Sequence, residues 1–237
     1  MKRFGLIGDK LSHSFSKTYF QEKFKRENLI GYEYHNFEID DISMLKNIII
    51  KNNLSGINIT IPYKERVIPF LDTLTNEAEI IGAVNTIQIV RNKLIGHNTD
   101  IYGFTKSFIP LIKKRKNALI LGDGGASKCI QLVMKKNNIN FIIASRNSKF
   151  SIDNILETHI NNHNIIINTT PLGMYPNTQT CPNIPYHAIS SKHLVFDLIY
   201  NPEESLFLKK AKLNKAETKN GAEMLYLQAE KSWKIWN

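Results

Sequence analysis

The sequence has few cysteines, no long apolar run and no recognised metal-binding pattern. Its two cysteines, Cys129 and Cys181, lie far apart and lack the spacing of a zinc site, so we expect neither a disulfide nor a bound metal. No apolar stretch approaches the roughly 20 residues that a membrane-spanning helix needs. The H-E-x-x-H pattern is absent, and His159 and His163 stand in an asparagine-rich segment typical of a surface.

No targeting segment is evident, and the charge of the chain is spread out. The apolar run at 4–8 is too short for the core of a signal peptide, so we expect a cytoplasmic protein that does not bind membranes. The formal net charge is +10, but the basic residues are scattered. The dense group Lys113–Lys116 indicates a solvated connection between a helix and a strand. We find no nucleic-acid recognition motif, and expect the charge to attract small anionic ligands.

The first hundred residues alternate between strand-like and helical patterns, which predicts an α/β domain with a mostly parallel sheet. The polar pair Arg91-Asn92 separates two strand patterns and predicts a β-hairpin. Strands are expected at 3–8, 32–39, 56–61, 83–90 and 93–97, and helices at 16–26, 42–51, 63–71 and 77–81.

A glycine-rich loop lies near the middle of the chain. Gly122, Gly124 and Gly125 follow an apolar strand pattern at 117–121 and precede a helical pattern at 127–136. A strand, a tight glycine turn and a helix N-terminus together form a cradle for the phosphates of a dinucleotide. Because this Rossmann-like unit begins only after residue 100, we expect a preceding domain that holds the substrate and the chemistry. Further elements are expected as strands at 139–144, 164–168 and 194–197, and as helices at 100–113, 202–213 and 222–236.

The residues at the end of the second strand of this unit indicate which dinucleotide the protein binds. In NAD-selective folds an acidic residue at this point binds the ribose hydroxyls. Here the strand is followed by Ser145 and Arg146, with Lys149 shortly after, and no acid occurs. A guanidinium can pair with a 2′-phosphate. The sequence therefore predicts NADP as the cofactor.

Polar residues follow a predicted strand in the first domain. Asn58 and Thr60 alternate with apolar residues, so their side chains share one face of the strand. Lys64 comes shortly after, at the carboxyl end of the strand, where open α/β sheets bind ligands. Such a lysine can act as a general acid or base. The alternative is a solvated lysine at the start of a helix.

Other polar groups in the first domain allow two interpretations. Asp100 either caps the helix that it begins or directs its carboxylate toward Lys64. Ser14 and Ser16, after the first strand, either cap the next helix or bind the carboxylate of a ligand. Asn85 stands at the entry to the predicted hairpin.

Taken in order, these motifs resemble the shikimate dehydrogenase family, NADP-dependent enzymes of chorismate and aromatic amino-acid biosynthesis. The resemblance covers almost the whole chain, and seven motifs in the right order are specific. They are H-S-x-S at His13–Ser16, N-[VI]-T-[VI]-P-x-K at Asn58–Lys64, G-A-x-N-T at Gly82–Thr86, N-T-D at Asn98–Asp100, N-x-[TS]-P-x-G-M at Asn168–Met174, D-x-x-Y-x-P at Asp197–Pro202 and G-x-x-M-L-x-x-Q-A at Gly221–Ala229.

The resemblance implies a reversible reduction of 3-dehydroshikimate to shikimate by NADPH. Lys64 would be the catalytic acid and base, with Asp100 as its partner. The implied substrate-binding residues are Ser14, Ser16 and Tyr200 for the carboxylate, Thr60, Asn85, Asp100 and Gln228 for the ring hydroxyls, and also Asn58. The implied cofactor-binding residues are Gly122, Gly124, Gly125, Ala126, Ser145, Arg146, Lys149, Thr169, Thr170, Gly221 and Met224.

The resemblance also implies an architecture. The expected parts are a substrate-binding catalytic domain at 1–100, an NADP-binding Rossmann domain at 101–219, and a C-terminal helix at 220–237 that packs on the first domain. An apolar stripe through Leu225, Ala229, Trp233 and Trp236 agrees with a helix that buries one face. The oligomeric state is expected to be a monomer or a homodimer.

Four residues depart from the family pattern. Lys17 replaces the usual proline after the second serine, and Asp123 replaces alanine in the glycine loop. The usual N-R-T after the second strand is Ser145-Arg146-Asn147, so Ser145 and Asn147 differ while the arginine is kept. A carboxylate at 123 is unfavourable near a pyrophosphate unless it points away or caps a backbone amide. Two alternatives stay open: a quinate and shikimate dehydrogenase that uses NAD, and a non-catalytic sensor of the same ligands.

Overall fold

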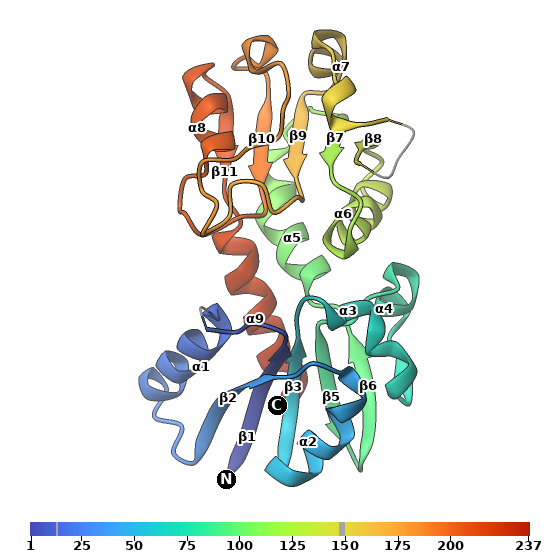
Figure 1. Ribbon diagram of the computed structural model, residues 1–237, viewed down its shortest axis with the longest axis vertical. Helices are drawn as coiled ribbons and strands as arrows, with labels where there is room; N and C mark the ends of the chain where they lie inside the picture. Colours follow the sequence, from blue (N-terminus) through green and yellow to red (C-terminus); the bar gives the residue numbers. More distant parts are fainter. Residues whose placement is uncertain (13, 147–149) are drawn as a thin grey trace. The chain divides into compact units, whose positions relative to one another are not determined.

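The computed structural model describes residues 1–12, 14–146 and 150–237, in two compact units (Figure 1). The first unit comprises residues 1–99 and 229–237, and the second comprises residues 100–228. Both are α/β, as predicted. Lys149, an expected cofactor-binding residue, lies outside the described residues.

The sheet of the first unit is mixed, in the order β2-β1-β3-β5-β6-β4. Strand β1 pairs in parallel with β2 and β3, whereas β5 is antiparallel to both β3 and β6. The short β4 pairs in parallel with β6. The strands are β1 (Lys2–Gly8), β2 (Tyr32–Glu38), β3 (Leu54–Ile59), β4 (Thr73–Leu74), β5 (Thr86–Val90) and β6 (Lys93–His97).

The predicted hairpin is confirmed as β5 and β6. Its two turn residues, Arg91 and Asn92, have φ values of 50° and 64°. Positive φ at both central positions characterises the two-residue turns that match the twist of antiparallel strands. The polar turn therefore closes the hairpin locally.

Two of the expected helices of the first unit, at 42–51 and 63–71, are each divided into an α-helix and a 3₁₀ turn. A single helix was expected at 63–71, but α3 (Tyr63–Arg66) ends early and a 3₁₀ turn follows at Ile68–Phe70. Pro69 lies in that turn, and because proline lacks an N–H it cannot continue the helical ladder. The other helices are α1 (Phe15–Arg26), a 3₁₀ turn at Ile42–Met44 with α2 (Leu45–Asn52), and α4 (Asn76–Ile81).

Two apolar clusters hold the first unit together. One is aliphatic and includes Ile57, Ile59 and Val67. The other is aromatic, and in it the ring of Phe4 stacks on that of Trp236 with centroids 4.9 Å apart. This aromatic cluster buries the end of the last helix against the first strand.

The sheet of the second unit is entirely parallel, in the order β11-β10-β9-β7-β8. Because β8 and β9 lie on opposite sides of β7, the strand order reverses at β7. This is the dinucleotide-fold order 3-2-1-4-5-6 without its third strand, as far as the described residues extend. The strands are β7 (Asn117–Leu121), β8 (Asn140–Ala144), β9 (Ile165–Asn168), β10 (Leu194–Asp197) and β11 (Glu217–Lys219).

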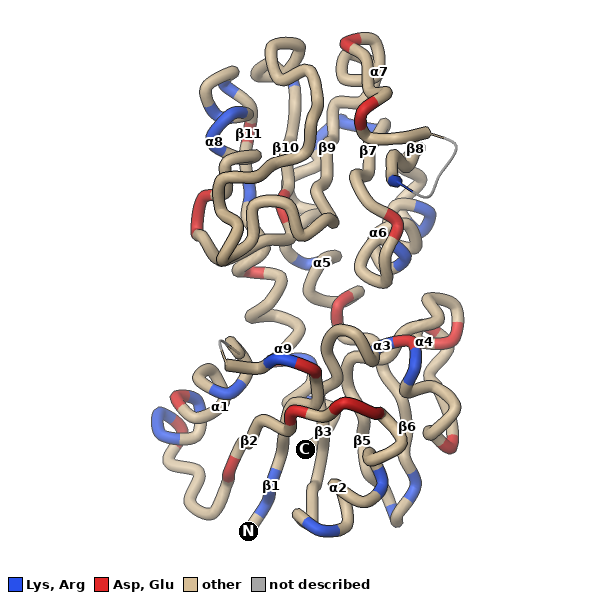
Figure 2. The backbone as a smooth tube through the Cα atoms, viewed as in Figure 1, with Lys and Arg blue, Asp and Glu red and all other residues tan. Residues whose placement is uncertain are grey.

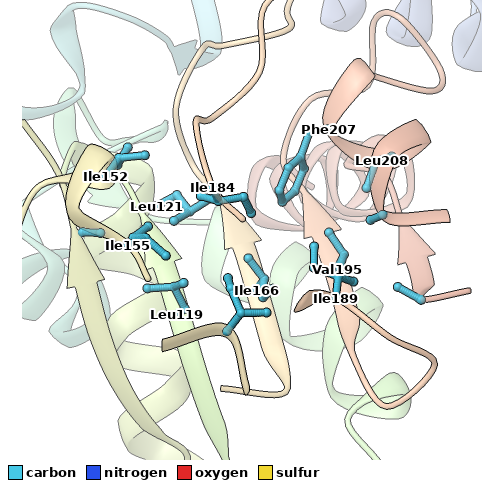
Figure 3. Packing of buried hydrophobic residues seen from close by; sticks show 14 residues of the cluster. Leu119, Leu121, Ile152, Ile155, Ile166, Ile184, Ile189, Val195, Phe207 and Leu208 are labelled. Atoms are coloured by element: carbon cyan, nitrogen blue, oxygen red, sulfur yellow. The ribbon is translucent and has the colours of Figure 1, made fainter. Parts of the chain in front are cut away.

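Helices cover both faces of this sheet. On one face, Phe207 and Leu208 of α8 pack with Leu121, Ile166 and Val195 of the strands (Figure 3). The cluster on the other face draws on α5, α6 and α9. Strands buried on both faces explain the continuous apolar runs at β7 and β9. The helices are α5 (Asp100–Phe108) with a 3₁₀ turn at Ile109–Leu111, α6 (Gly125–Lys136), α7 (Glu157–Asn162), α8 (Leu206–Leu213) and α9 (Ala222–Trp236); further 3₁₀ turns lie at Ile152–Asn154 and Tyr186–Ala188.

Helix α9 is continuous and contributes to the cores of both units. Met224 joins a cluster of the second unit, and Ala229 and Trp236 join the aromatic cluster of the first. The division between the units therefore falls within this helix, after Gln228, and not at the expected boundary after residue 219. The functional assignment of the domains stays a prediction.

Lysines and arginines are scattered over the backbone of both units (Figure 2). In the basic group at 113–116, Lys113 and Arg115 both form ion pairs with Glu217, at 2.9 and 3.0 Å. The group is thus partly neutralised by strand β11.

Candidate functional site

Two expected substrate-binding residues of the first unit, Asn58 and Asn85, belong to one buried hydrogen-bond network. Asn58, at the end of β3, is 5% exposed. Its amide nitrogen donates to Oγ1 of Thr86 at 3.1 Å and to Oγ of Ser232 at 3.0 Å. Its amide oxygen accepts a hydrogen bond from the hydroxyl of Tyr34 at 2.8 Å. The side chain of Asn58 therefore holds two strands and the last helix together.

Asn85 occupies the other side of this network. Its side-chain oxygen accepts from the backbone N–H of Thr99 at 2.7 Å and from the Thr99 hydroxyl at 3.2 Å. Thr86 and Ser232 share a hydroxyl contact of 2.7 Å. Asn85 and the segment before Asp100 are thus held in a fixed orientation, which suits a site that must present polar groups without rearranging.

The two serines after β1 have different surroundings. Ser16 lies near the hydroxyl of Tyr34: burial raises the pKa of Tyr34, and the Ser16 side chain opposes this shift. Ser14 is the N-cap residue of α1 but makes no side-chain capping bond. Its Oγ is buried and finds no hydrogen-bond partner among the described residues. A buried hydroxyl without a partner is costly unless a ligand satisfies it.

Lys64 lies in the short helix α3, directly after the end of β3. Its backbone carbonyl accepts the N–H of Val84 at 2.8 Å. Thr60 is anchored by its N–H, which donates to the carbonyl of Ile7 at 2.9 Å. The backbone at the carboxyl ends of β1 and β3 is therefore fixed, and the side chain of Lys64 is half-buried.

His97 ends strand β6 within the motif that leads to Asp100. Its Nε2 is buried and has no partner among the described residues. Burial, aided by the charge of Lys231, lowers the pKa of His97, so the ring is neutral at pH 7. Sequence reasoning did not single out this residue.

Asp100 and Gln228 belong to the second unit, and both are buried. Asp100 is the first residue of α5. A Cβ atom at Gly103, one turn further on, would lie 3.2 Å from Cβ of Gln228. The absence of a side chain at Gly103 therefore lets α5 and α9 approach closely, which places Gln228 against the first turns of α5.

The glycine loop lies where ligands bind in such sheets, at the carboxyl end of β7 next to the reversal of strand order. Gly122 has a φ of +106°, and a Cβ atom there would lie 2.5 Å from Oγ1 of Thr169. Only glycine suits both constraints. Thr169 in turn donates from Oγ1 to the carbonyl of Leu121 at 2.7 Å. The glycine turn is thus held in place by residues at the ends of both β7 and β9.

The start of α6 fits a dinucleotide pyrophosphate. Gly124 is its N-cap, and no side chain of the described residues caps it. A Cβ atom at Gly124 would meet nothing within 4 Å, so the backbone borders open space. The N–H groups of the first turn, at Gly125 and Ala126, have no partner within the helix. Such a helix N-terminus binds phosphate through backbone donors.

The end of β8 carries the residues expected to recognise the ribose. Ser145 is 2% exposed and Arg146 is exposed. The Ser145 hydroxyl donates to Oδ2 of Asp123 at 2.8 Å. Asp123, whose place in the loop departs from the family pattern, thus directs its carboxylate toward the end of the second strand.

A second polar group lies at the ends of β9 and β10. Asn168 donates to Oδ1 of Asp197 at 3.0 Å and accepts from both the N–H and the hydroxyl of Thr170. The Ser205 hydroxyl also donates to Asp197. Burial raises the pKa of Asp197 to about 6, although these hydrogen bonds oppose the shift. The group fixes the loops that follow both strands, including Thr170.

The remaining expected residues have different surroundings. Tyr200 is 37% exposed, and partial burial raises the pKa of its phenol. Gly221 donates its N–H to the carbonyl of Ile199 at 3.0 Å, and a side chain there would collide with the carbonyl oxygen of Leu198. Met224 is 8% exposed and belongs to the apolar core of the unit.

Sequence reasoning missed residues that the network needs. Ser232 and Tyr34 carry no motif of their own, because their polarity is explained only by partners distant in sequence. Thr86, Thr99 and Asp197 stand inside the quoted motifs, and their burial could have been suspected from their apolar neighbours.

Among the described residues, no group of three or more histidine, cysteine, aspartate or glutamate side chains could hold a metal ion. Within the same residues, no helix has both the length and the apolar character to cross a membrane.

Comparison with known proteins gives a consistent result. A family model described as the shikimate dehydrogenase substrate binding domain matches residues 6–87. The shikimate dehydrogenase (NADP(+)) of Methanococcus maripaludis is 40% identical over 257 aligned positions, which cover 99% of this chain and 91% of that protein.

Solved structures show the same likeness. A crystal structure of a shikimate dehydrogenase in complex with NADP⁺ has a TM-score of 0.90 and 35% identity, and covers 100% of this chain and 90% of that one. The shikimate 5-dehydrogenase of Listeria monocytogenes, in complex with shikimate and NAD, has a TM-score of 0.87 and 27% identity, with 100% and 91% covered. Likeness of this degree over the whole length shows that the chain belongs to the shikimate dehydrogenase family.

Proposed function

We propose that the protein is a shikimate dehydrogenase that reversibly reduces 3-dehydroshikimate to shikimate with NADPH. The observation that carries the proposal is the uncapped helix N-terminus behind Gly124, at the strand-order reversal of a fully parallel sheet. Similarity over almost the whole chain to an NADP-dependent shikimate dehydrogenase supports it.

The second unit is assigned the cofactor. The backbone N–H groups of Gly124, Gly125 and Ala126 would bind the pyrophosphate, and Arg146 would pair with the 2′-phosphate. When bound, NADPH supplies the hydride that reduces the carbonyl carbon. The further cofactor residues proposed are Gly122, Ser145, Lys149, Thr169, Thr170, Gly221 and Met224. Of these, Thr169 and Gly221 bond to the backbone of the same unit and Met224 lies in its apolar core, so these three would shape the site.

The first unit is assigned the recognition of the substrate carboxylate, through Ser14 and Ser16 together with Tyr200 of the second. The buried Ser14 hydroxyl, without a partner among the described residues, supports this assignment. Thr60, Asn85, Asp100 and Gln228 would bind ring hydroxyls. Asn58 was expected to touch the substrate as well; its hydrogen bonds to Asn85 and Thr86 favour an indirect role, in which it orients both residues.

Lys64 is assigned the proton transfer. In the reduction, its ammonium donates a proton to the oxygen of the substrate carbonyl as that oxygen gains negative charge, and the lysine is later reprotonated by water. The positive charge also stabilises the developing alkoxide. Asp100 would hold the reacting hydroxyl. In the direction of oxidation the neutral amine accepts the same proton.

The test measures the formation of reduced nicotinamide by its absorbance. Shikimate or quinate is supplied with NADP⁺ or NAD⁺, which gives four progress curves. We expect the fastest reaction with shikimate and NADP⁺. A fastest reaction with quinate and NAD⁺ would favour a quinate dehydrogenase, and no reaction in any of the four would favour a sensor. The cytoplasmic location and the monomeric or homodimeric state stay predictions.

A further inference from the structure

Asp123 is the residue of the glycine loop that the family pattern does not explain. It stands between Gly122, with φ +106°, and Gly124, the N-cap of α6. Its side chain is exposed, yet one carboxylate oxygen accepts a hydrogen bond of 2.8 Å from Ser145. The contact joins the loop after β7 to the end of the neighbouring strand β8.

Ser145 is well fixed at that strand end. It is buried, and its N–H donates to the carbonyl of Phe150 at 3.0 Å. Its hydroxyl carries one proton, which is directed to Asp123. Asp123 therefore has a defined orientation: one oxygen faces Ser145, and the exposed carboxylate keeps further acceptor positions for a ligand.

The position of this carboxylate matters for cofactor choice. NAD-selective dinucleotide folds place an acid at the end of the second strand, where it accepts hydrogen bonds from the ribose hydroxyls. Here the second strand, β8, has no acid at its end, and Asp123 brings a carboxylate to the same place from the adjacent loop. A carboxylate there accepts from a 2′-hydroxyl and repels a 2′-phosphate. Arg146, directly after Ser145, has the opposite preference.

We propose that Asp123 determines cofactor specificity: its carboxylate, oriented by Ser145, accepts a hydrogen bond from the 2′-hydroxyl of NAD and opposes the 2′-phosphate of NADP. The dissociation constants for NADP⁺ and NAD⁺ therefore differ less than they would if Arg146 were the only residue that distinguishes the two dinucleotides. This inference rests on the proposed function, because it concerns the same cofactor site.

The experiment measures dissociation constants for NADP⁺ and NAD⁺ by titration calorimetry, without turnover. Asp123→Asn and Asp123→Ala are compared with the unchanged protein. We expect the dissociation constant for NADP⁺ to fall about tenfold and that for NAD⁺ to rise a few-fold, since tenfold corresponds to about 1.4 kcal/mol. Ser145→Ala, which releases the carboxylate, should shift the ratio of the two constants in the same direction by less.

Asp153→Asn is the matched control, because Asp153 is an exposed acid in the same unit and its replacement changes the net charge equally. It should leave both constants unchanged within twofold. Equal tightening of NADP⁺ and NAD⁺ by Asp123→Ala would overturn the inference, because it would place the carboxylate near the pyrophosphate common to both. Unchanged constants would overturn it too. If the unchanged protein binds neither dinucleotide, the proposed function itself is contradicted, and this outcome is distinct from the two that overturn the inference about Asp123.

Discussion

The side-chain amide of Asn58 donates a hydrogen bond to Oγ of Ser232, 3.0 Å away and 174 positions later in the chain. This bond ties strand β3 to the final turns of α9. Because Thr86 and Thr99 also contact the Ser232 hydroxyl, at 2.7 and 3.2 Å, one small side chain serves three partners. Ser232 therefore holds Asn58, Thr86 and Thr99 together.

Ser232→Ala should destabilise the first unit by about 1–3 kcal/mol, because it leaves buried polar groups without a partner. The protein has two tryptophans, Trp233 and Trp236, and both belong to the aromatic cluster of this unit. Tryptophan fluorescence during chemical denaturation therefore reports its unfolding. Lys234→Ala, on the exposed side of the same helix, should change the midpoint little. Equal midpoints for both variants would contradict a structural role for Ser232.

Ser14→Ala should weaken shikimate binding about tenfold without loss of stability, because its buried hydroxyl has no partner to lose among the described residues. Ser16→Ala is the companion variant: it removes a hydroxyl close to that of Tyr34 and should lower stability by at most about 1 kcal/mol. Isothermal titration with shikimate and thermal unfolding measure the two effects. A Ser14→Ala protein that is less stable but binds shikimate normally would make Ser14 a structural residue.

Lys64→Ala should lower turnover by about 10²- to 10⁴-fold, the usual contribution of a general acid. Binding of shikimate and NADP⁺ should change only a few-fold, since the backbone contact of Lys64 with Val84 does not depend on its side chain. Steady-state rates and separate titrations check both statements. Lys51→Ala, an exposed lysine of α2, serves as the control and should keep full activity. Turnover close to normal in Lys64→Ala would exclude the proposed proton transfer.

Arg146→Ala should raise the dissociation constant for NADP⁺ by about 10- to 100-fold, which corresponds to the loss of one charge-assisted hydrogen bond. The constant for NAD⁺, which has no 2′-phosphate, should change less than threefold. Arg91→Ala, at the hairpin turn of the first unit, removes the same charge at an exposed position elsewhere. If both dinucleotides lose affinity equally, Arg146 does not recognise the 2′-phosphate.

Asp197→Asn should stabilise the protein at neutral pH. Burial raises the pKa of the Asp197 carboxyl from 3.8 to about 6. The folded state therefore binds the proton of this carboxyl more tightly than the unfolded state does. The protonated carboxyl of Asp197 contributes fully to the free energy of unfolding below about pH 4, and this contribution is lost as the pH rises through about 6. The stability difference, variant minus unchanged protein, should therefore increase over this range, by on the order of 2–3 kcal/mol.

Thermal unfolding at pH 4, 5, 6 and 7 measures this difference for Asp197→Asn. Asp153→Asn, at an exposed carboxylate, should show no such trend. A difference that stays constant with pH would mean that Asp197 titrates normally in the folded protein.

Local patterns in the sequence predicted much of the fold. The turn Arg91-Asn92 and the spacing of Gly122, Gly124 and Gly125 identify a hairpin and a nucleotide-binding turn, because both depend on backbone conformations confined to a few residues. The alternation around Asn58 and Thr60 showed which face of β3 is polar. These features require no knowledge of distant partners.

Tertiary partners account for what sequence reasoning missed. Ser232 reads as a polar interruption of an apolar helix face, and its role becomes clear only beside Asn58 and Thr86. In the sequence, Asp123 looks unsuited to a pyrophosphate-binding loop. Its hydrogen bond to Ser145 depends on the pairing of β7 with β8, which the sequence does not reveal. The early end of α3 has a different, local cause: Pro69 stands within the helix expected at 63–71 and was not taken into account there.

Strand β8 has a single neighbour, β7, among the described residues. Ser145 and Arg146, which follow Ala144, therefore lie at the edge of the sheet, where no further strand must accommodate the side chain of Arg146. Arg146 is exposed, so substitutions of this residue are constrained more by a ligand than by packing of the core. Cofactor preference in this protein can accordingly change through exposed residues such as Arg146 and Asp123 while β7 and the first unit stay unchanged.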